Sequence, residues 1–348
     1  MGRSIGTVRQ ALAALPRLLV LATLGLCACA PQKRVVVYTA AEADQLPKYA
    51  AAFKAAHPDI ELVWVRDSTG VLTAKLLAEK KAPRADAVFA TAATSILQLD
   101  EQGVLAPYTP LRVDRLDKRF RDPQHPAHWD GEALFASAIC VNTIEAAKRG
   151  LPIPQTWEDL TKPIYKGAIS MPDPASSGTG LLTVNGWLQT WGEAKGWDYM
   201  DRLDKNILSY DHSGSKPCKD AARGEVPIGI SFDFRASRTE SEGAPIVVVV
   251  PPSAVGWDLE ASAVVAGAPH PKAAQVFVDW AMSDAAMKLY ADSFSIVGVN
   301  SFNKPAPYLP TDLASRLAPV DLAWTARNRV RILAEWTRRY EAKAARKE

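Results

Sequence analysis

Histidine and cysteine are scarce in this chain, and long apolar runs are absent after its N-terminal segment. Its 348 residues include five histidines and four cysteines. So few histidines leave few candidates for a Ser-His-acid catalytic triad. His125 and His128, in the loop HPAHWD, lack a third ligand at a suitable spacing, so no metal site is expected. No later stretch is apolar enough to cross a membrane.

Neither sign of charge dominates the chain. The formal net charge is +3, from 41 Lys and Arg against 38 Asp and Glu. Residues 1–29 contain three arginines and no acid, so their removal leaves 38 basic residues against 38 acidic ones. This near-neutral balance argues against nucleic acid or an anionic membrane surface as the partner.

The N-terminal segment has the pattern of a secretory signal. Its arginines precede the short apolar run 18–26, which leads into Leu26-Cys27-Ala28-Cys29. This pattern predicts a signal peptide over residues 1–29, too short to span a membrane, and export of the mature chain. The last four residues resemble a bacterial lipoprotein box, which would make Cys29 a lipidated N-terminus and the only membrane anchor. Cleavage by ordinary signal peptidase is the alternative.

Two cysteines, Cys140 and Cys218, remain after the predicted signal. In an oxidising compartment, two cysteines favour one disulfide bond. Two separate buried thiols are the alternative, because the sequence does not give the distance between their Cα atoms.

Short β-branched runs alternate with helical patterns from residue 34 onward. The alternation predicts an α/β fold with mainly parallel sheets, and a mature chain of about 320 residues is long enough for two lobes. We expect lobe 1 to contain residues 34–131 and about 253–300, and lobe 2 residues 132–252 and about 301–348. Residues 156–159 have the pattern of a capping box, and residues 303–310 that of a linker. The expected strands are residues 34–38, 60–66, 86–90, 134–141, 168–171, 207–210, 228–232 and 246–250. The expected helices are residues 42–56, 71–81, from about 95, from 179, 194–204, from about 216, 271–282, 284–290 and 322–343.

The stretch MPDPASSGTG, residues 171–180, precedes an apolar helical pattern. It places Ser176, Ser177, Gly178 and Thr179 at a helix N-terminus, where free N–H groups and the helix dipole favour an anion. Simple capping by one of the serines is the alternative interpretation.

Polar residues follow most of the predicted strands. Carboxyl ends of parallel strands meet at one edge of a sheet, so these residues are expected to face one crevice between the lobes. Such a crevice is where a hinged protein binds its ligand. The polar strand ends are Tyr38-Thr39 with Glu42, residues 67–70, 91–95, 176–179 and 212–216, and Asp233 to Arg235.

Five stretches of the sequence resemble a known family. They are VYTAAEADQLPKY, WVRDSTGVLTAKLLAE, PASSGTG, HSGSKPCK and GISFDFRA. At these stretches the chain resembles the periplasmic binding proteins of ABC importers for 2-aminoethylphosphonate, from about residue 35 to the C-terminal RILAEWTRRYEAK. The resemblance implies a two-lobed fold of the class II type, which delivers its ligand to the importer's permease and needs neither catalysis nor cofactor. These proteins are similar to ferric-iron-binding proteins, whose paired tyrosines are replaced here by Phe232-Asp233-Phe234.

The zwitterion 2-aminoethylphosphonate needs hydrogen-bond donors at one end and a carboxylate at the other. We expect Asp233 to bind the amine, with Glu42 as second choice. Asp258 and Glu260 are weaker candidates, because acids are more often exposed on the surface. Trp257 belongs either to the cleft or to the core. The expected phosphonate ligands are Ser176, Ser177, Gly178, Thr179, Ser213, Ser215, Thr39, Thr69 and Ser95.

Other functions remain open from the sequence. The same fold could hold another phosphonate, a phosphate ester or ferric iron. A hydrolase is more remote: Ser213-Gly214-Ser215-Lys216 matches the S-x-x-K pattern of penicillin-interacting enzymes, but the companion motifs K-T-G and S-D-N are missing.

Overall fold

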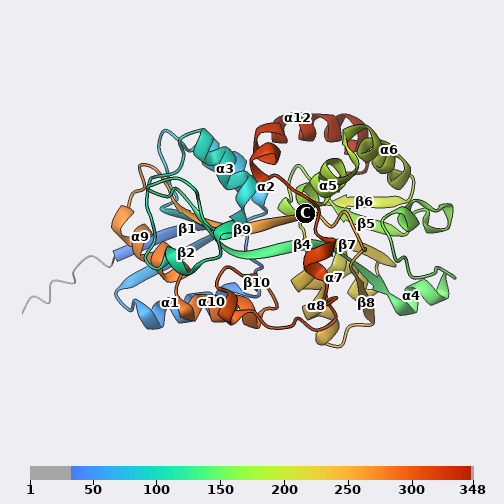
Figure 1. Ribbon diagram of the computed structural model, residues 1–348, viewed down its shortest axis with the longest axis horizontal. Helices are drawn as coiled ribbons and strands as arrows, with labels where there is room; N and C mark the ends of the chain where they lie inside the picture. The colour runs from blue at the N-terminus through green and yellow to red at the C-terminus, as the bar shows by residue number, and fades with distance from the viewer. Residues whose placement is uncertain (1–32, 346–348) are drawn as a thin grey trace, which may run out of the picture. The chain divides into compact units, whose positions relative to one another are not determined.

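A computed structural model describes residues 33–345 of the chain (Figure 1). The predicted signal peptide and Cys29 lie outside these residues. None of the helices described combines the length and apolarity that a membrane span requires.

Residues 33–101 form the first βα group. Its strands pair in the order β2-β1-β3, all parallel, as the sequence predicts. The parallel arrangement places the carboxyl ends of all three strands at one edge. The elements are β1 (Lys33–Thr39), α1 (Leu46–Ala56), β2 (Ile60–Arg66), α2 (Thr69–Ala78), β3 (Ala87–Ala92) and α3 (Ala93–Glu101).

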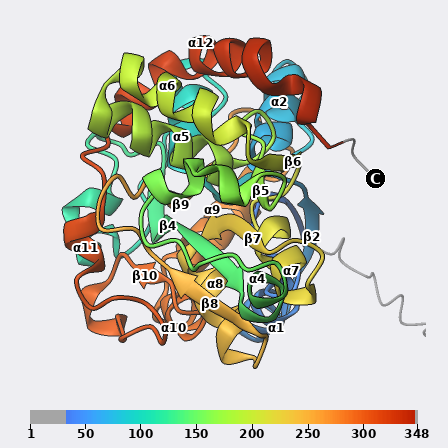
Figure 2. The same cartoon turned by 90° about the vertical axis from the view of Figure 1, so that its right-hand side faces the viewer.

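Residues 169–241 form the second βα group. Its strands pair in the order β7-β5-β6, again parallel. Helices α5 and α6 lie on one face of these strands and α7 and α8 on the other (Figures 1 and 2). The elements are β5 (Ile169–Pro172), α5 (Gly178–Trp191), α6 (Glu193–Asp204), β6 (Ile207–Asp211), α7 (Lys216–Arg223), β7 (Ile228–Phe232) and α8 (Asp233–Ser241).

Two long strands connect the groups. Strand β4 (Asp130–Asn142) pairs antiparallel with β9 (Trp257–Val264) along its first half and with β7 and β8 (Ile246–Val249) along its second. Strand β9 also pairs antiparallel with β3, so the complete sheet is mixed. Strand β9 is not among the strands predicted from the sequence, because Asp258 and Glu260 break the apolar pattern of a buried strand.

The rest of the chain covers the two groups. Residues 303–310 contain no helix or strand, as predicted. Residues 156–159 form the predicted capping box with aspartate in the acidic position, since Thr156 and Asp159 exchange hydrogen bonds of 3.0 and 3.1 Å. The remaining elements are α4 (Thr143–Lys148), α9 (Pro271–Ala281), α10 (Asp284–Asp292), β10 (Ile296–Val297), α11 (Leu313–Arg316) and α12 (Leu322–Tyr340). Short 3-10 turns lie at Val113–Arg115, Lys118–Phe120, Glu158–Thr161, Pro163–Tyr165, Asn300–Phe302 and Glu341–Lys343.

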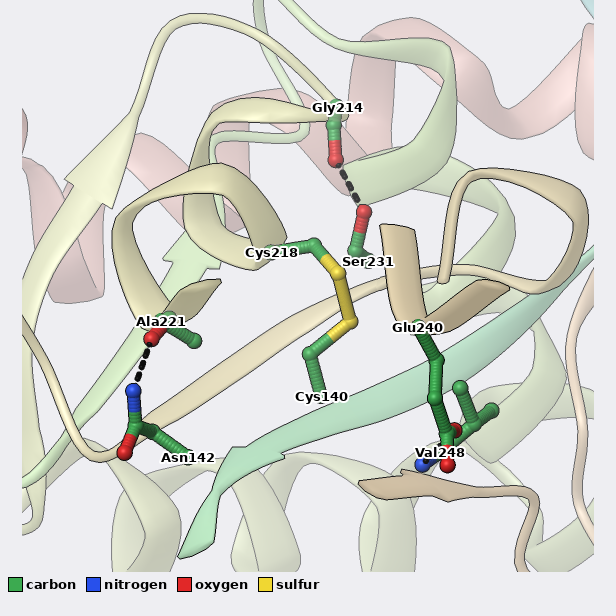
Figure 3. Close-up of a disulfide and its surroundings, with 8 residues drawn as sticks. All are labelled: Cys140, Asn142, Gly214, Cys218, Ala221, Ser231, Glu240 and Val248. Atoms are coloured by element: carbon green, nitrogen blue, oxygen red, sulfur yellow. Dashed lines mark hydrogen bonds between the residues drawn. A yellow bond between two sulfur atoms is a disulfide. The ribbon is translucent and has the colours of Figure 1, made fainter. Parts of the chain in front are cut away.

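A disulfide joins Cys140 of β4 to Cys218 of α7, with the Cα atoms 5.3 Å apart (Figure 3). Asn142 donates a hydrogen bond of 2.7 Å to the carbonyl of Ala221 at the other end of α7. Ser231 Oγ of β7 donates one of 2.8 Å to the carbonyl of Gly214. These links hold α7 and the loop before it against the sheet.

Candidate functional site

A cavity lies where the carboxyl ends of β1, β2 and β3 meet the start of α5 and the end of β7. Its empty volume, counted with its opening to solvent, is about 470 Å³. Both βα groups contribute to its wall, as the sequence predicts for a ligand crevice. The cavity is lined by Ala40, Glu42, Arg66, Ser68, Thr69, Ala90, Ala92, Phe135, Ser177, Gly178, Thr179, Gly214, Phe232, Phe234 and Glu260.

Two helix N-termini face this cavity, one from each βα group. Helix α2 begins at Thr69 after Ser68, and α5 begins at Gly178 after Ser177. The two helix starts touch: a Cβ atom added to Gly178 would lie 2.9 Å from Thr69 Oγ1. Because both helix dipoles present their positive ends to the same space, the wall favours a bound anion.

The start of α5 is capped by a side chain and still has N–H groups available to bind an anion. Ser177 Oγ accepts a hydrogen bond of 3.3 Å from the N–H of Gly180, so this serine is the N-cap. The N–H groups of Gly178 and Thr179 have no acceptor within residues 33–345. The two interpretations of this motif are therefore compatible, since the cap satisfies one donor and leaves two toward the cavity.

Arg66 adds a positive charge to the cavity wall and is not among the ligands predicted from the sequence. It ends β2, is exposed, and lines the cavity two residues before Ser68. Its Nε donates to the carbonyl of Ala41 at 3.2 Å, and its terminal nitrogens have no partner within the described chain. A cation two residues before a Ser-Thr-Gly helix start was the available signal in the stretch WVRDSTG.

Two carboxylates line the cavity, and they differ in their partners. Glu42 Oε2 accepts hydrogen bonds from Arg235 at 2.8 Å and Lys219 at 3.0 Å. Burial alone would raise the pKa of Glu42, but these two cations outweigh it and lower the pKa. Glu42 is thus ionised and already neutralised by protein.

Glu260 is the second carboxylate. Its side chain forms no hydrogen bond or ion pair with another side chain or backbone group of residues 33–345. Burial raises the pKa of Glu260 well above its usual range, and the neighbouring carboxyls of Glu132, Glu42 and Asp233 raise it further. A lone acid facing a cavity is suited to a cationic ligand group, which would replace its proton.

The other acids considered from the sequence have structural partners. Asp233 is buried, and its Oδ1 accepts the N–H groups of Ala136 at 3.1 Å and Phe234 at 2.8 Å. Burial raises the pKa of Asp233 to about 7. Asp258 is 1% exposed, accepts a hydrogen bond of 2.6 Å from Thr94 Oγ1, and has a pKa raised by burial to about 6. The expectation that Asp258 is a surface acid is therefore wrong.

The structure brings some of the predicted ligands to the cavity and leaves others away from it. Glu42, Thr69, Ser177, Gly178 and Thr179 line it. The other predicted residues, Thr39, Ser95, Ser176, Ser213, Ser215, Asp233 and Trp257, are not part of its wall.

Most of the residues outside the wall have other partners. Thr39 Oγ1 accepts the N–H of Ala41 at 3.1 Å, and Ser176 Oγ donates to the carbonyl of His212 at 2.9 Å. The hydroxyls of Ser213 and Ser215 lie 3.3 Å apart. Trp257 Nε1 donates to the carbonyl of Ala318 at 2.9 Å. The Ser95 hydroxyl is buried without a partner among the described residues.

Direct contacts hold the two βα groups together around the cavity. The N–H of Gly70 in α2 donates to the carbonyl of Ser176 at 2.8 Å. His212 Nε2 lies 3.1 Å from Asp67 Oδ1. These contacts, with the Glu42 ion pairs, join the two βα groups beside the cavity.

Among residues 33–345, the side chains do not assemble the S-x-x-K hydrolase site or the ferric site considered from the sequence. In the S-x-x-K stretch, Lys216 Nζ pairs with Asp220 at 2.6 Å and Asp211 at 3.7 Å, so acids surround the amine. Within residues 33–345, no group of three or more His, Cys, Asp or Glu side chains could hold a metal ion. Phe232 and Phe234, where the resemblance to ferric-iron-binding proteins implies paired tyrosines, line the cavity with their rings.

A cavity between two βα groups is typical of a ligand-binding protein, and the fold is the two-lobed periplasmic binding protein fold of the class II type. The chain belongs to the family described as bacterial extracellular solute-binding protein, which it matches over residues 48–304. An uncharacterized protein of Haemophilus influenzae is 31% identical over 287 residues, covering 80% of this chain and 83% of the other.

Two further proteins are similar along most of their length. A probable ABC transporter periplasmic-binding protein of Sinorhizobium fredii is 26% identical over 273 residues, which are 77% of this chain and 72% of that one. The structure of the periplasmic binding protein AfuA of Actinobacillus pleuropneumoniae, with fructose-6-phosphate bound, superposes with a TM-score of 0.83 at 29% identity. That superposition covers 89% of this chain and 99% of AfuA.

Proposed function

We propose that this chain is the periplasmic solute-binding component of an ABC importer, and that its solute is 2-aminoethylphosphonate, delivered to the permease. The observation that carries the proposal is the composition of one cavity wall. It combines two helix N-termini and Arg66 with the unpaired carboxyl of Glu260. The wall therefore matches a small solute that carries an anionic and a cationic end.

The anionic end would be held by backbone and hydroxyl donors. A phosphonate carries a charge of about −1.5 to −2 near neutral pH, by analogy with a phosphate monoester. Gly178 and Thr179 offer free N–H groups, Thr69 offers a hydroxyl, and Arg66 offers two terminal nitrogens. Each is a neutral or cationic donor, so the site compensates the charge without a metal.

The cationic end would be held by Glu260. This assignment replaces Asp233, whose Oδ1 is occupied by two backbone N–H groups and which does not line the cavity. It also replaces Glu42, which already has two cationic partners. An ammonium beside Glu260 would gain a charge-assisted hydrogen bond and relieve the repulsion between neighbouring carboxyls.

The assignment to an ABC importer is supported by the Sinorhizobium relative, whose name describes such a component. The predicted signal peptide agrees with a periplasmic location. The hydrogen bond between Gly70 and Ser176, which joins the two βα groups, fits a protein that encloses its solute between them.

A phosphate ester such as a sugar phosphate is the second candidate. The observation that favours it is the likeness to AfuA, whose structure contains fructose-6-phosphate. In that case the protonated Glu260 would donate a hydrogen bond to a sugar hydroxyl. Ferric iron is less suited, because the phenylalanine rings supply no oxygen ligand.

Calorimetric titration of the mature protein with 2-aminoethylphosphonate, ethylphosphonate, fructose-6-phosphate and ferric citrate tests the proposal. We expect 2-aminoethylphosphonate to bind at least about tenfold more tightly than ethylphosphonate, because only the first has an amine. Glu260→Gln should remove that difference, whereas the matched Asp233→Asn should keep it. Tighter binding of fructose-6-phosphate than of either phosphonate would favour the second candidate and reject the first.

A further inference from the structure

Three phenylalanine rings form one side of the cavity. Phe135, Phe232 and Phe234 line it, and each is less than 8% exposed. The ring centroids of Phe135 and Phe232 lie 6.2 Å apart at 85°, and those of Phe232 and Phe234 4.6 Å apart at 62°. The rings therefore meet edge to face and form a continuous apolar surface, which we call the phenylalanine wall.

The sheet register places this wall beside Glu260. In the antiparallel pairing of β4 with β9, Phe135 lies opposite Asp258 and Ala133 opposite Glu260. Side chains two residues apart on a strand share a face, so Phe135 and Glu260 are diagonal neighbours on one face. On the other side of β4, Phe232 lies opposite Ser137 and belongs to the same face. Three adjacent strands thus place two rings and the carboxyls of Asp258 and Glu260 on one face, and of these two acids only Glu260 lines the cavity.

This surface suits a methylated ammonium group. A primary ammonium has three N–H donors, and Glu260 is the only carboxyl of the wall without a protein partner in residues 33–345. The phenylalanine wall accepts no hydrogen bond, but ring faces attract a cation whose charge is spread over methyl groups. A methylated ammonium is also less strongly hydrated, so burying it against rings costs less.

We propose that the cationic end of the cavity binds N-methylated ammonium groups, so that the solutes include phosphonates and phosphate monoesters with a methylated amine two carbons from the phosphorus group. This inference rests on the proposed function, since it assumes an anionic end held by the helix N-termini. It enlarges the solute class from one compound to a series that shares a phosphorus anion and a methylated cation.

Titration with a series of four phosphonates tests the inference. The ligands are 2-aminoethylphosphonate, its N-methyl and N,N,N-trimethyl derivatives, and 3,3-dimethylbutylphosphonate, which has carbon in place of the trimethylated nitrogen. We expect the methylated compounds to bind within about threefold of the primary amine or more tightly, and the uncharged compound at least about tenfold more weakly. Weakening of the trimethyl compound beyond about threefold, or equal binding of the uncharged one, overturns the inference.

The outcomes separate this inference from the proposed function. Binding of 2-aminoethylphosphonate with rejection of the methylated compounds leaves the proposed function intact and overturns the inference. Binding of the methylated compounds without 2-aminoethylphosphonate supports the inference and rejects that solute. If none of the four binds, both fail.

Substitution of the wall gives an independent test. Phe232→Leu keeps an apolar side chain but removes the ring, so the trimethyl compound should lose at least about fivefold in affinity and the primary amine less. Phe135→Leu serves as a second variant should Phe232→Leu fail to fold. Phe302→Leu, at a partly buried ring outside the cavity wall, is the control and should bind as the parent protein does. Equal affinity of all variants for the trimethyl compound overturns the inference.

Discussion

Arg235 and Glu42 form a buried ion pair between the two βα groups. The guanidinium of Arg235, at the start of α8, donates to Glu42 Oε2 at 2.8 Å, although the residues are 193 positions apart. Their side chains are 4% and 7% exposed. Arg235 also contacts Asp44 at 2.9 Å, so one side chain joins two acids of the first group to the second.

Arg235→Ala should destabilise the protein by about 3–5 kcal/mol, because it leaves the carboxylate of Glu42 buried with one cation fewer. Urea unfolding measures the change. The matched control is Arg223→Ala in α7, whose ion pairs are more exposed and should contribute less than about 1 kcal/mol. Equal losses of unfolding free energy in the two variants would show that the buried Arg235 ion pair stabilises the protein no more than an exposed pair does.

The parallel part of the fold could be predicted from the sequence because its signals are local. Runs such as residues 60–66 and 228–232 are apolar and β-branched, and the structure has β2 and β7 with the same bounds. Strand β9 could not be found in this way. The surroundings of its acids are tertiary and no local pattern reports them: Asp258 accepts a hydrogen bond from Thr94, and Glu260 faces the cavity.

The candidate site likewise contains residues that local sequence patterns predict and residues that depend on tertiary structure. Ser177, Gly178 and Thr179 could be predicted because a helix start has a characteristic composition. Glu260 and Phe135 could not, because their position depends on the register between β4 and β9. Asp233 has the residue type expected for an amine ligand, but backbone N–H groups occupy its Oδ1, which a sequence cannot indicate.

Ionisation of the buried carboxyl of Glu132 should make the protein less stable as the pH rises. Burial raises the pKa of Glu132 from 4.5 to about 8, and the neighbouring Asp130 adds to the effect. The pKa of Glu132 is higher in the folded state than in the unfolded state. The contribution of its protonated carboxyl to stability is therefore complete below pH 4.5 and is lost as the pH rises to about 8. Glu132→Gln, which cannot ionise, should therefore gain stability relative to the parent across this range.

Unfolding measured at several pH values between 5 and 8 checks this prediction. The control is Asp292→Asn, because Lys288 and Lys304 lower the pKa of Asp292 and its substitution should give no gain with rising pH. If the unfolding free energies of Glu132→Gln and the parent protein changed equally with pH, the raised pKa of Glu132 would be contradicted.

Binding of the amine should release a proton from Glu260. Burial and neighbouring acids keep its carboxyl protonated above the usual range, and an adjacent ammonium favours the ionised form. Calorimetry at pH 7 in buffers of different ionisation enthalpy should therefore report up to about one proton more released by the parent protein than by Glu260→Gln on binding 2-aminoethylphosphonate. Comparing the two proteins with the same ligand cancels protons lost by the phosphonate itself. Equal proton release by the two proteins would place the proton elsewhere.

Gly178→Ala should weaken solute binding more than it weakens the fold. A Cβ atom at residue 178 would lie 2.9 Å from Thr69 Oγ1 and 3.2 Å from Ala92 Cβ, so it would push apart the two helix starts that line the cavity. Alanine is itself favourable in a helix, which offsets part of the cost. We expect a loss of at least about tenfold in affinity with a change in unfolding free energy below about 1 kcal/mol.

Ser177→Ala provides the matched comparison for Gly178→Ala, because it removes the N-cap of α5 and adds no atom to the contact with α2. Loss of a cap costs about 1 kcal/mol in stability. The N–H groups of Gly178 and Thr179 remain, so binding should fall less than in Gly178→Ala. The two variants thus separate the structural role of this helix start from its role in binding: if Gly178→Ala bound the solute as the parent does, the contact between the helix starts would not form part of the site.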